Sequence, residues 1–272
     1  MQSESVTANL KFLANLDEPL VYIPSRGGGD QTEHVGNFTM RQVSIRDGRH
    51  DKASASLEVE GFCLVKQETK VKDFYDDAEI ETTWHEEVKA LLGKQTGASR
   101  VEIFDDTRRS ASRERQRAMH IREPADIVHN DYTASSGIKR LRDHFAGDPR
   151  EADKLLQRRF AIINVWRPIA GPVHNHHVAL CDASSVRPDE LVSMQRRAEE
   201  RIGEIQVAIF GPDQRWYYFP GMQMNEALLI KTFDSEEDGR ARFTIHTSFA
   251  DPNAPANAPA RESIETRCFV FF

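Results

Sequence analysis

The chain has 272 residues, with 36 Lys and Arg against 43 Asp and Glu, so its formal net charge is −7 and its pI is about 5.8. This balance argues against non-specific binding to nucleic acid, which requires a net basic surface. Hydrophobic residues make up 39% and charged residues 29%, a composition typical of a folded globular protein. We expect one domain over residues 1–272, in which residues 1–100 extend a core formed by residues 101–272.

The sequence has no unbroken apolar run that would serve as a secretory signal or cross a membrane. Cys63, Cys181 and Cys268 are odd in number and far apart, which argues against a disulfide framework or a zinc knuckle. We therefore expect a soluble protein of the cytoplasm that has neither a membrane nor a nucleic acid as a partner.

In chain order, the first hundred residues predict strands and a helix. Residues 37–45 and 56–67 alternate polar and apolar side chains, as strands do. Residues 83–94 place four large apolar side chains on one face of a helix, and residues 100–104 predict another strand. The glycine-rich run at residues 26–30 precedes no evident helix, so it predicts a structural loop and not a phosphate-binding one.

Six arginines lie between residues 105 and 122. Such a run is usually a solvated loop or a frayed helix. The alternative is a mobile segment over a pocket that meets an anionic substrate or cosubstrate. The spacing of the arginines does not separate the two interpretations.

Strands dominate the second half, so we expect a mainly β protein with flanking helices. Arg187-Pro188-Asp189 predicts the start of an amphipathic helix that is inserted into the core and runs to about residue 205. Residues 137–145 and 149–157 predict two short helices. The predicted strands are residues 125–132, 159–167, 206–210, 216–220, 227–233, 242–249 and 261–272.

The motif His129-Asn130-Asp131 lies at the end of a predicted strand. Residues i and i+2 of an extended chain project to the same side, so the imidazole and the carboxylate can bind one metal ion together. His246, in the middle of a later predicted strand, is a candidate third ligand. A structural hydrogen-bonded pair and a core histidine are the alternative interpretation.

Arg261 and Ser263 lie at the start of the last predicted strand. If Arg261 points into a barrel, Ser263 points the same way, because side chains alternate with a period of two. A guanidinium makes paired, charge-assisted hydrogen bonds, so Arg261 with Ser263 suits a planar carboxylate.

The order H-x-D, a distant His and then R-x-S resembles the Fe(II)- and 2-oxoglutarate-dependent oxygenases. Further motifs resemble their hydroxylase/desaturase group, which includes cephamycin-biosynthesis-related proteins and a meroterpenoid endoperoxidase. These motifs are residues 164–168 (NVWRP), 171–172 (GP), 179–182 (ALCD), 216–220 (WYYFP), 230–234 (IKTFD) and 261–265 (RESIE).

The resemblance implies a double-stranded β-helix, or jelly roll, around an iron centre. His129, Asp131 and His246 would hold Fe(II) on one triangular face and leave three positions open for 2-oxoglutarate and dioxygen. Arg261 with Ser263 would bind the distal carboxylate of 2-oxoglutarate. The implied activity is hydroxylation or desaturation at a C–H bond of a small secondary metabolite, and the resemblance also suggests a homodimer.

Other residues are weaker candidates. Asn164 or Arg167, on the strand at residues 159–167, could contact 2-oxoglutarate or substrate, although three positions separate them and strict alternation places them on opposite faces. At most one of Tyr217 and Tyr218 faces the pocket, and Tyr218 is our candidate for substrate contact. His174, in a histidine-rich stretch where the family suggests acidic or small residues, is a candidate for the rim of the site.

Two other functions compete with the oxygenase. A cupin-like metal dioxygenase that does not use 2-oxoglutarate would take His174, His176 and His177 as ligands, although a cupin site also requires a glutamate a few residues on. A jelly-roll binding module would keep the fold without catalysis.

Overall fold

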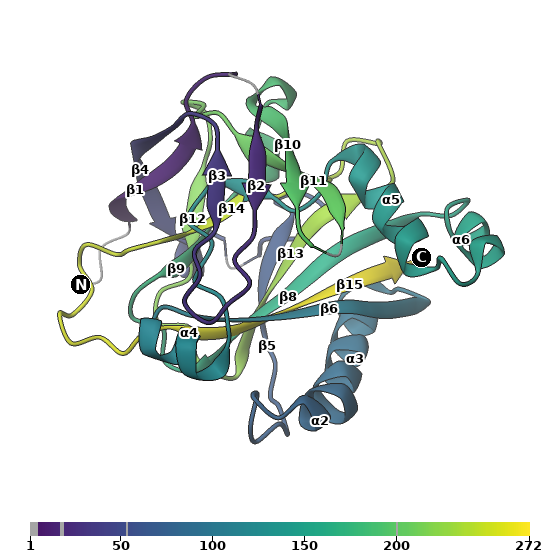
Figure 1. The fold of residues 1–272 in the computed structure, drawn as a ribbon, viewed down its shortest axis with the longest axis horizontal. Helices are drawn as coiled ribbons and strands as arrows, with labels where there is room; N and C mark the ends of the chain where they lie inside the picture. The colour runs from purple at the N-terminus through teal and green to yellow at the C-terminus, as the bar shows by residue number, and fades with distance from the viewer. Residues whose placement is uncertain (1–4, 17–18, 53, 200) are drawn as a thin grey trace.

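The computed structural model describes residues 5–16, 19–52, 54–199 and 201–272 of the chain. Two β-sheets form its core, and helices lie outside them (Figure 1). This arrangement confirms the expected mainly β fold with flanking helices. The division into a core and an N-terminal extension stays a prediction, although β1 and β4 of the N-terminal part belong to the larger sheet.

The larger sheet has ten strands and includes both metal-ligand strands, β7 and β14. Its middle pairs are antiparallel: β14 pairs with β9 on one side and with β7 on the other. In order across the sheet the strands are β1 (Ser5–Leu13), β4 (Phe38–Asp47), β12 (Trp216–Tyr218), β9 (His177–Cys181), β14 (His246–Phe249), β7 (His129–Asn130), β11 (Ile202–Ala208), β10 (Leu191–Arg197), β2 (Val21–Ile23) and β3 (Glu33–Val35).

The smaller sheet has five antiparallel strands. In order they are β5 (Phe62–Lys66), β13 (Glu226–Asp234), β8 (Phe160–Ala170), β15 (Glu262–Phe271) and β6 (Arg100–Ser110).

The helices are short, and none of those among the described residues is long and apolar enough to cross a membrane. The predicted helices at residues 83–94, 137–145 and 149–157 are confirmed as α3, α5 and α6. The full set is α1 (Gly48–Asp51), α2 (Asp77–Glu79), the π-helix η1 (Ile80–Trp84), α3 (His85–Thr96), α4 (Arg113–Met119), α5 (Ala134–His144), α6 (Pro149–Leu155) and the 3-10 helices η2 (Ala183–Ser185) and η3 (Pro188–Glu190).

Alternation along β8 separates the interior of the barrel from its outer support. Ile163 and Val165 face outward into a hydrophobic cluster with Trp84 and Val88, from η1 and α3. Asn164 and Trp166 face the opposite way, toward the larger sheet. The predicted buried strand is therefore confirmed. One face of β8 packs into the hydrophobic cluster beneath η1 and α3, and the other lines the interior of the barrel.

The predicted helix at residues 187–205 is wrong. Only its first turn forms, as η3, and the chain then continues as the antiparallel hairpin of β10 and β11. Pro188 starts a helical turn as expected. The following segment, however, lies between the strands β2 and β7, and it can form backbone hydrogen bonds with both only as extended chain. Those interstrand hydrogen bonds override the local helical preference.

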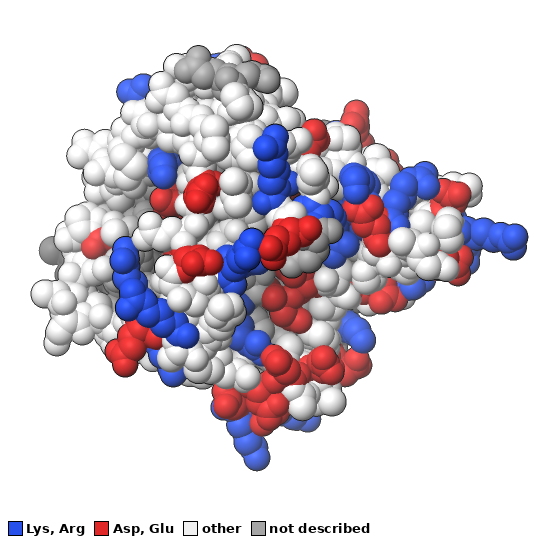
Figure 2. Space-filling view, in the orientation of Figure 1, with Lys and Arg blue, Asp and Glu red and all other residues white. Residues whose placement is uncertain are grey.

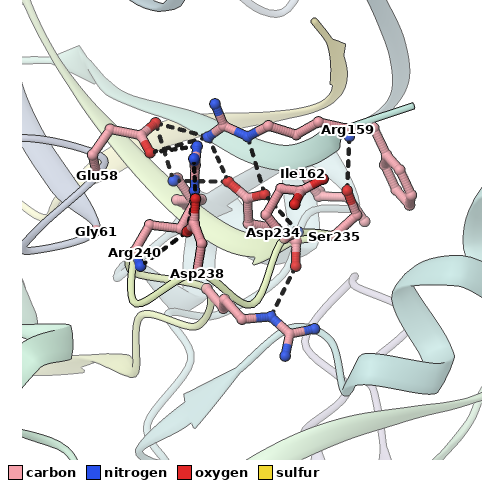
Figure 3. Close-up of polar contacts among 12 residues, drawn as sticks. Glu58, Gly61, Arg159, Ile162, Asp234, Ser235, Asp238 and Arg240 are labelled. Carbon is pink, nitrogen blue, oxygen red and sulfur yellow. Dashed lines mark hydrogen bonds and ion pairs between the residues drawn. The ribbon is translucent and has the colours of Figure 1, made fainter. Parts of the chain in front are cut away.

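A cluster of charged side chains ties the loop before β5 to β8 and β13 (Figure 3). Lys231 and Asp234 are both fully buried, and their charged atoms lie 2.9 Å apart. Arg159 reaches Asp234 at 2.7 Å and Glu58 at 2.9 Å. Burial acts to raise the pKa of Asp234, but the hydrogen bond from Arg159 and the charge of Lys231 outweigh burial and lower that pKa.

We expect Asp234→Ala to destabilise the fold by about 3 kcal/mol, because it removes the buried partner of the Lys231 ammonium and leaves it only the half-exposed Glu58. The free energy of unfolding in urea measures this loss. Asp238→Ala is the matched control: Asp238 pairs with Arg240 in the same cluster, but its side chain is about half exposed, so little change is expected. Equal losses of unfolding free energy in the two variants would show that the buried pair of Lys231 and Asp234 is not what stabilises the cluster.

The same group makes stability depend on pH. Because folding lowers the pKa of Asp234, its contribution is complete above the ordinary value of 3.8 and is lost as the pH falls through the lower, folded-state pKa. The Asp234→Ala variant should therefore lose less stability than the wild type on acidification below pH 4, as measured by urea unfolding at each pH.

Candidate metal centre and active site

His129, Asp131 and His246 come together between the two sheets. One possible ligand atom from each lies within 4.8 Å of the others. His129 and His246 are directly opposite each other in the antiparallel pair of β7 and β14, which places their ring centroids 4.5 Å apart. Asp131 follows β7, and its Oδ1 is 3.6 Å from Nε2 of His129.

Backbone carbonyls orient both imidazoles in the same way. Nδ1 of His129 lies 2.8 Å from the carbonyl oxygen of Ile127, and Nδ1 of His246 lies 2.9 Å from that of Thr244. With Nδ1 donating its proton to a carbonyl, Nε2 keeps the lone pair that a metal requires. Burial and the neighbouring His129 lower the pKa of His246, which favours the neutral, ligating form.

The other oxygen of Asp131 is held by the smaller sheet. Oδ2 accepts hydrogen bonds from Nδ2 of Asn164 at 2.7 Å and from Nε of Arg267 at 3.0 Å. Burial acts to raise the pKa of Asp131, but the charge of Arg267 and the two imidazoles hold that pKa well below its ordinary value. An ionised carboxylate therefore presents its free Oδ1 toward the histidines.

These donors fit ferrous iron. Two neutral imidazoles and one carboxylate form the facial set used by non-heme iron oxygenases, and the partners of the ligands are already in place. Among the described residues, this is the only group of three or more His, Cys, Asp or Glu side chains placed to share an ion. The stretch around His174, His176 and His177 forms no such group.

A narrow cavity leads from the two histidines to Arg261. His129, His246, Trp166 and Arg261 all line this space, which measures about 30 Å³. Arg261 is 3% exposed and donates a hydrogen bond from Nη1 to the carbonyl oxygen of His176 at 2.8 Å, whereas its Nε has no partner among the described residues. Burial and the charge of Arg109 lower the pKa of Arg261 to about 9.

Ser263 lies beside Arg261 with a buried hydroxyl that has no hydrogen-bond partner among the described residues. Arg261, just before β15, and Glu265, within it, both line the narrow cavity, and Ser263 lies between them in the same period-two row. An unpaired guanidinium nitrogen and an unpaired hydroxyl at one buried place fit a carboxylate ligand. Because the cavity is so small, a ligand the size of 2-oxoglutarate requires side chains to move as it binds.

The structure separates Asn164 from Arg167. Asn164 bridges Asp131 and Glu265, with 2.7 Å to each, so it positions the candidate metal ligand. The prediction that Arg167 contacts cosubstrate or substrate is wrong. Its guanidinium is fully buried on the outer face, 5.1 Å from the ring centre of Phe74 and 5.0 Å from that of Trp84. The alternation of β8 turns the side chain away from the interior.

Tyr218 and His174, the two candidate substrate residues, are not among the described residues that line the narrow cavity. Tyr218 is buried in a hydrophobic cluster, where its ring packs edge-on against His177 and Phe249. His174 is exposed in the loop between β8 and β9. The histidine-rich stretch contributes through its backbone instead, because the carbonyl of His176 accepts the hydrogen bond from Arg261.

Sequence reasoning missed both Arg267 and Glu265. Glu265 is 6% exposed and accepts a hydrogen bond from Nη2 of Arg267 at 2.9 Å. Arg267 also donates to Asp105 and Asp131, so one guanidinium holds three carboxylates. The sequence does contain a signal for both residues. Residues 261, 263, 265 and 267 alternate along one side of a predicted strand, and we expect Arg261 and Ser263 to point into the barrel.

Known proteins match the chain over most of its length. A family model described as an oxidoreductase/YMDC permease-like domain matches residues 10–271. The chain is 34% identical over 275 residues to the hydroxylase/desaturase CTB9 of Cercospora beticola, covering 91% of this chain and 83% of that one. It is 32% identical over 248 residues to the Fe(II)/2-oxoglutarate-dependent dioxygenase nvfI of Aspergillus novofumigatus, covering 89% and 87%.

Solved structures point to the same group of proteins as the sequence relatives. The iron and alpha-ketoglutarate-dependent endoperoxidase NvfI superposes with a TM-score of 0.84 at 29% identity over 98% of both chains. The same enzyme in a different conformation gives a TM-score of 0.85 over 100% of this chain and 99% of that chain.

A jelly-roll fold closed around a His-Asp-His cluster defines the class of non-heme iron oxygenases that use 2-oxoglutarate, another name for alpha-ketoglutarate. Within this class, the chain belongs to the family of Fe(II)/2-oxoglutarate-dependent hydroxylases and desaturases represented by CTB9 and nvfI. The expected fold, the oxygenase activity and the need for Fe(II) and 2-oxoglutarate are thereby confirmed.

We expect Asn164→Ala to weaken Fe(II) binding about 10- to 100-fold, because the variant removes one of the two donors that orient Asp131. Anaerobic titration with Fe(II) measures the dissociation constant. Asn175→Ala, a change at a loop amide remote from the triad, is the control and should keep the wild-type constant. Unchanged affinity in Asn164→Ala would show that Arg267 alone suffices to orient Asp131.

Proposed function

We propose that the chain oxidises a C–H bond of a small secondary metabolite, by hydroxylation or desaturation. Fe(II) would be held by His129, Asp131 and His246, and the distal carboxylate of 2-oxoglutarate by Arg261 with Ser263. The observation that carries the proposal is the convergence of the three ligand atoms at one end of a cavity whose other end is a buried, incompletely paired guanidinium.

With Fe(II) bound, dioxygen would take two electrons from 2-oxoglutarate, which becomes succinate and carbon dioxide, and two from the C–H bond of the substrate. The protein binds and orients. Asn164 and Arg267 keep the carboxylate of Asp131 aimed at the ion, and carbonyl groups keep both imidazoles aimed with it. The apolar side chains of Trp166 and Ile230 line the narrow cavity and limit the access of water to it.

The two competing functions have less support. A cupin-like dioxygenase requires metal ligands in the His174 stretch, yet His174 is exposed and His177 is buried 3.7 Å from Asp251. A non-catalytic binding module would not require three side chains oriented to bind one metal ion. Dioxygen and a small molecule remain the partners we propose. The cytoplasmic location, the homodimer and the lack of a membrane or nucleic-acid partner stay predictions.

We expect anaerobic addition of Fe(II) and 2-oxoglutarate to the wild type to produce the weak visible charge-transfer absorption of a metal–keto acid chelate. Asp131→Ala should abolish this absorption and succinate formation, because it removes the only carboxylate of the candidate triad. His174→Ala is the control, and it should retain both. Retention of both signals in Asp131→Ala would contradict the assigned triad. Absence of both signals from the wild type, with oxygen consumption that requires no 2-oxoglutarate, would favour the cupin-like alternative.

We expect Arg261→Leu to raise the dissociation constant for 2-oxoglutarate by about 10-fold or more, because it removes charge-assisted hydrogen bonds to the distal carboxylate. Arg261→Lys keeps the charge without the planar fork and should give an intermediate value. Titration of the charge-transfer absorption at saturating Fe(II) measures both constants. Wild-type affinity in Arg261→Leu would place the distal carboxylate elsewhere.

A further inference from the structure

A second, wider cavity reaches the triad from the other side. It has a volume of about 360 Å³, and His129 and Asp131 form part of its wall. Seven of its lining side chains are Lys or Arg, and three are Asp or Glu. Figure 2 shows basic side chains gathered around a hollow near the middle of this face, with acidic ones beside them. The basic excess contrasts with a chain whose net charge is −7.

The acidic groups of this wall already have partners. Asp105 and Asp131 both pair with Arg267. Glu204 accepts hydrogen bonds from the hydroxyl groups of Thr133 and Ser135, at 3.1 and 3.0 Å. None of the three makes an ion pair with Arg109, Arg122 or Arg196, although the charge of Asp105 acts on Arg122 from a greater distance.

Most of the other basic groups are also occupied. Lys139 and Arg201 both reach Asp143, at 2.7 and 3.8 Å, and Arg140 lies over the ring of Phe104. Arg109, Arg122 and Arg196 differ from these. Among the described residues, none of these three makes an ion pair, and only Arg109 makes a side-chain hydrogen bond, to the carbonyl oxygen of Glu123 at 2.8 Å.

Backbone pairing holds these arginines close to one another. Arg109 on β6 forms a bridge with Arg122, and Arg196 on β10 is the register partner of Tyr22 on β2. Tyr22 also lines the cavity, so the two pairs meet across it. Burial and the charge of Arg109 lower the pKa of Arg122, and burial likewise lowers that of Arg196. Gathering like charges in a partly buried place is costly unless an anion neutralises them.

We propose that the substrate is a small organic acid, whose carboxylate is bound by Arg122 and Arg196 beside the iron centre. This inference rests on the proposed function and narrows its substrate class. Two guanidinium groups can each offer paired donors to a carboxylate. Arg109 lines both cavities, so it lies between this carboxylate and the 2-oxoglutarate site at Arg261.

The test uses naphthalene-2-carboxylate as the acid and its methyl ester as the neutral control. Each is titrated calorimetrically into the full chain at saturating Mn(II) and 2-oxoglutarate, so that the Arg261 site is already filled. We expect the wild type to bind the acid about 10-fold or more tightly than the ester, the ratio that a charged hydrogen bond supports. Arg122→Gln and Arg196→Gln should each lose most of this preference and keep the affinity for the ester.

Arg197→Gln is the matched control, because Arg197 neighbours Arg196 on β10 but is exposed and bonds Gln195, so this variant should keep the wild-type preference. Equal affinity for acid and ester in the wild type would overturn the proposal, as would a preference that survives both test variants. Naphthalene-2-sulfonate binding 10-fold more tightly than the carboxylate would overturn the assignment to a carboxylate in favour of a sulfate or phosphate group.

The outcome is separable from the test of the proposed function. Arg122→Gln and Arg196→Gln should retain the charge-transfer absorption with Fe(II) and 2-oxoglutarate, which also shows that both variants fold. A wild type that lacks this absorption refutes the oxygenase itself. A wild type that has it and binds acid and ester equally refutes only the organic acid substrate.

Discussion

One carboxylate, that of Asp131, links the two sheets where the candidate ligands meet. Its Oδ2 takes donors from Asn164 on β8 and Arg267 on β15, and its Oδ1 faces His129 on β7. A buried carboxylate without partners is costly, so this side chain holds β7 at a fixed place opposite the smaller sheet. The pairing of β7 with β14 then brings His246 alongside His129. The geometry of the centre thus follows from satisfying a single charged group.

The triad divides the interior into two unlike environments. On one side, a narrow cavity with Trp166 and Ile230 in its wall leads to the incompletely paired guanidinium of Arg261, as expected for a cosubstrate with one distal carboxylate. On the other side, the wider cavity carries an excess of positive charge from β6, β10 and the segment after α4. Arg122 and Arg196 line only the wider of these two cavities and Arg261 only the narrow one, so two anions could approach one metal from separate directions. This separation allows a 2-oxoglutarate enzyme to accept an acidic substrate.

The outer layers stabilise this arrangement without touching it. The outward side chains of β8, β13 and β15 form a hydrophobic cluster with α3, and Arg167 is enclosed there between aromatic rings. The buried pair of Lys231 and Asp234 joins β13 to Arg159 and to the loop that carries Glu58 (Figure 3). Because each strand uses alternate residues for support and for the interior, changes on the outer face affect stability more directly than chemistry.

The sequence by itself determined the local pattern: period-two strands, the placement of His129 with Asp131 on one side of a strand, and that of Arg261 with Ser263 on another. It also determined the family, through motifs that occur in order along the chain. Only the tertiary structure decided that residues 191–208 form a hairpin, that Arg267 and Glu265 contact the candidate centre, and that Tyr218 packs in a hydrophobic cluster. It also decided which arginines of residues 105–122 remain without an acidic partner. The reason is physical, since local spacing dictates where a side chain points, whereas its partner comes from a strand distant in the chain.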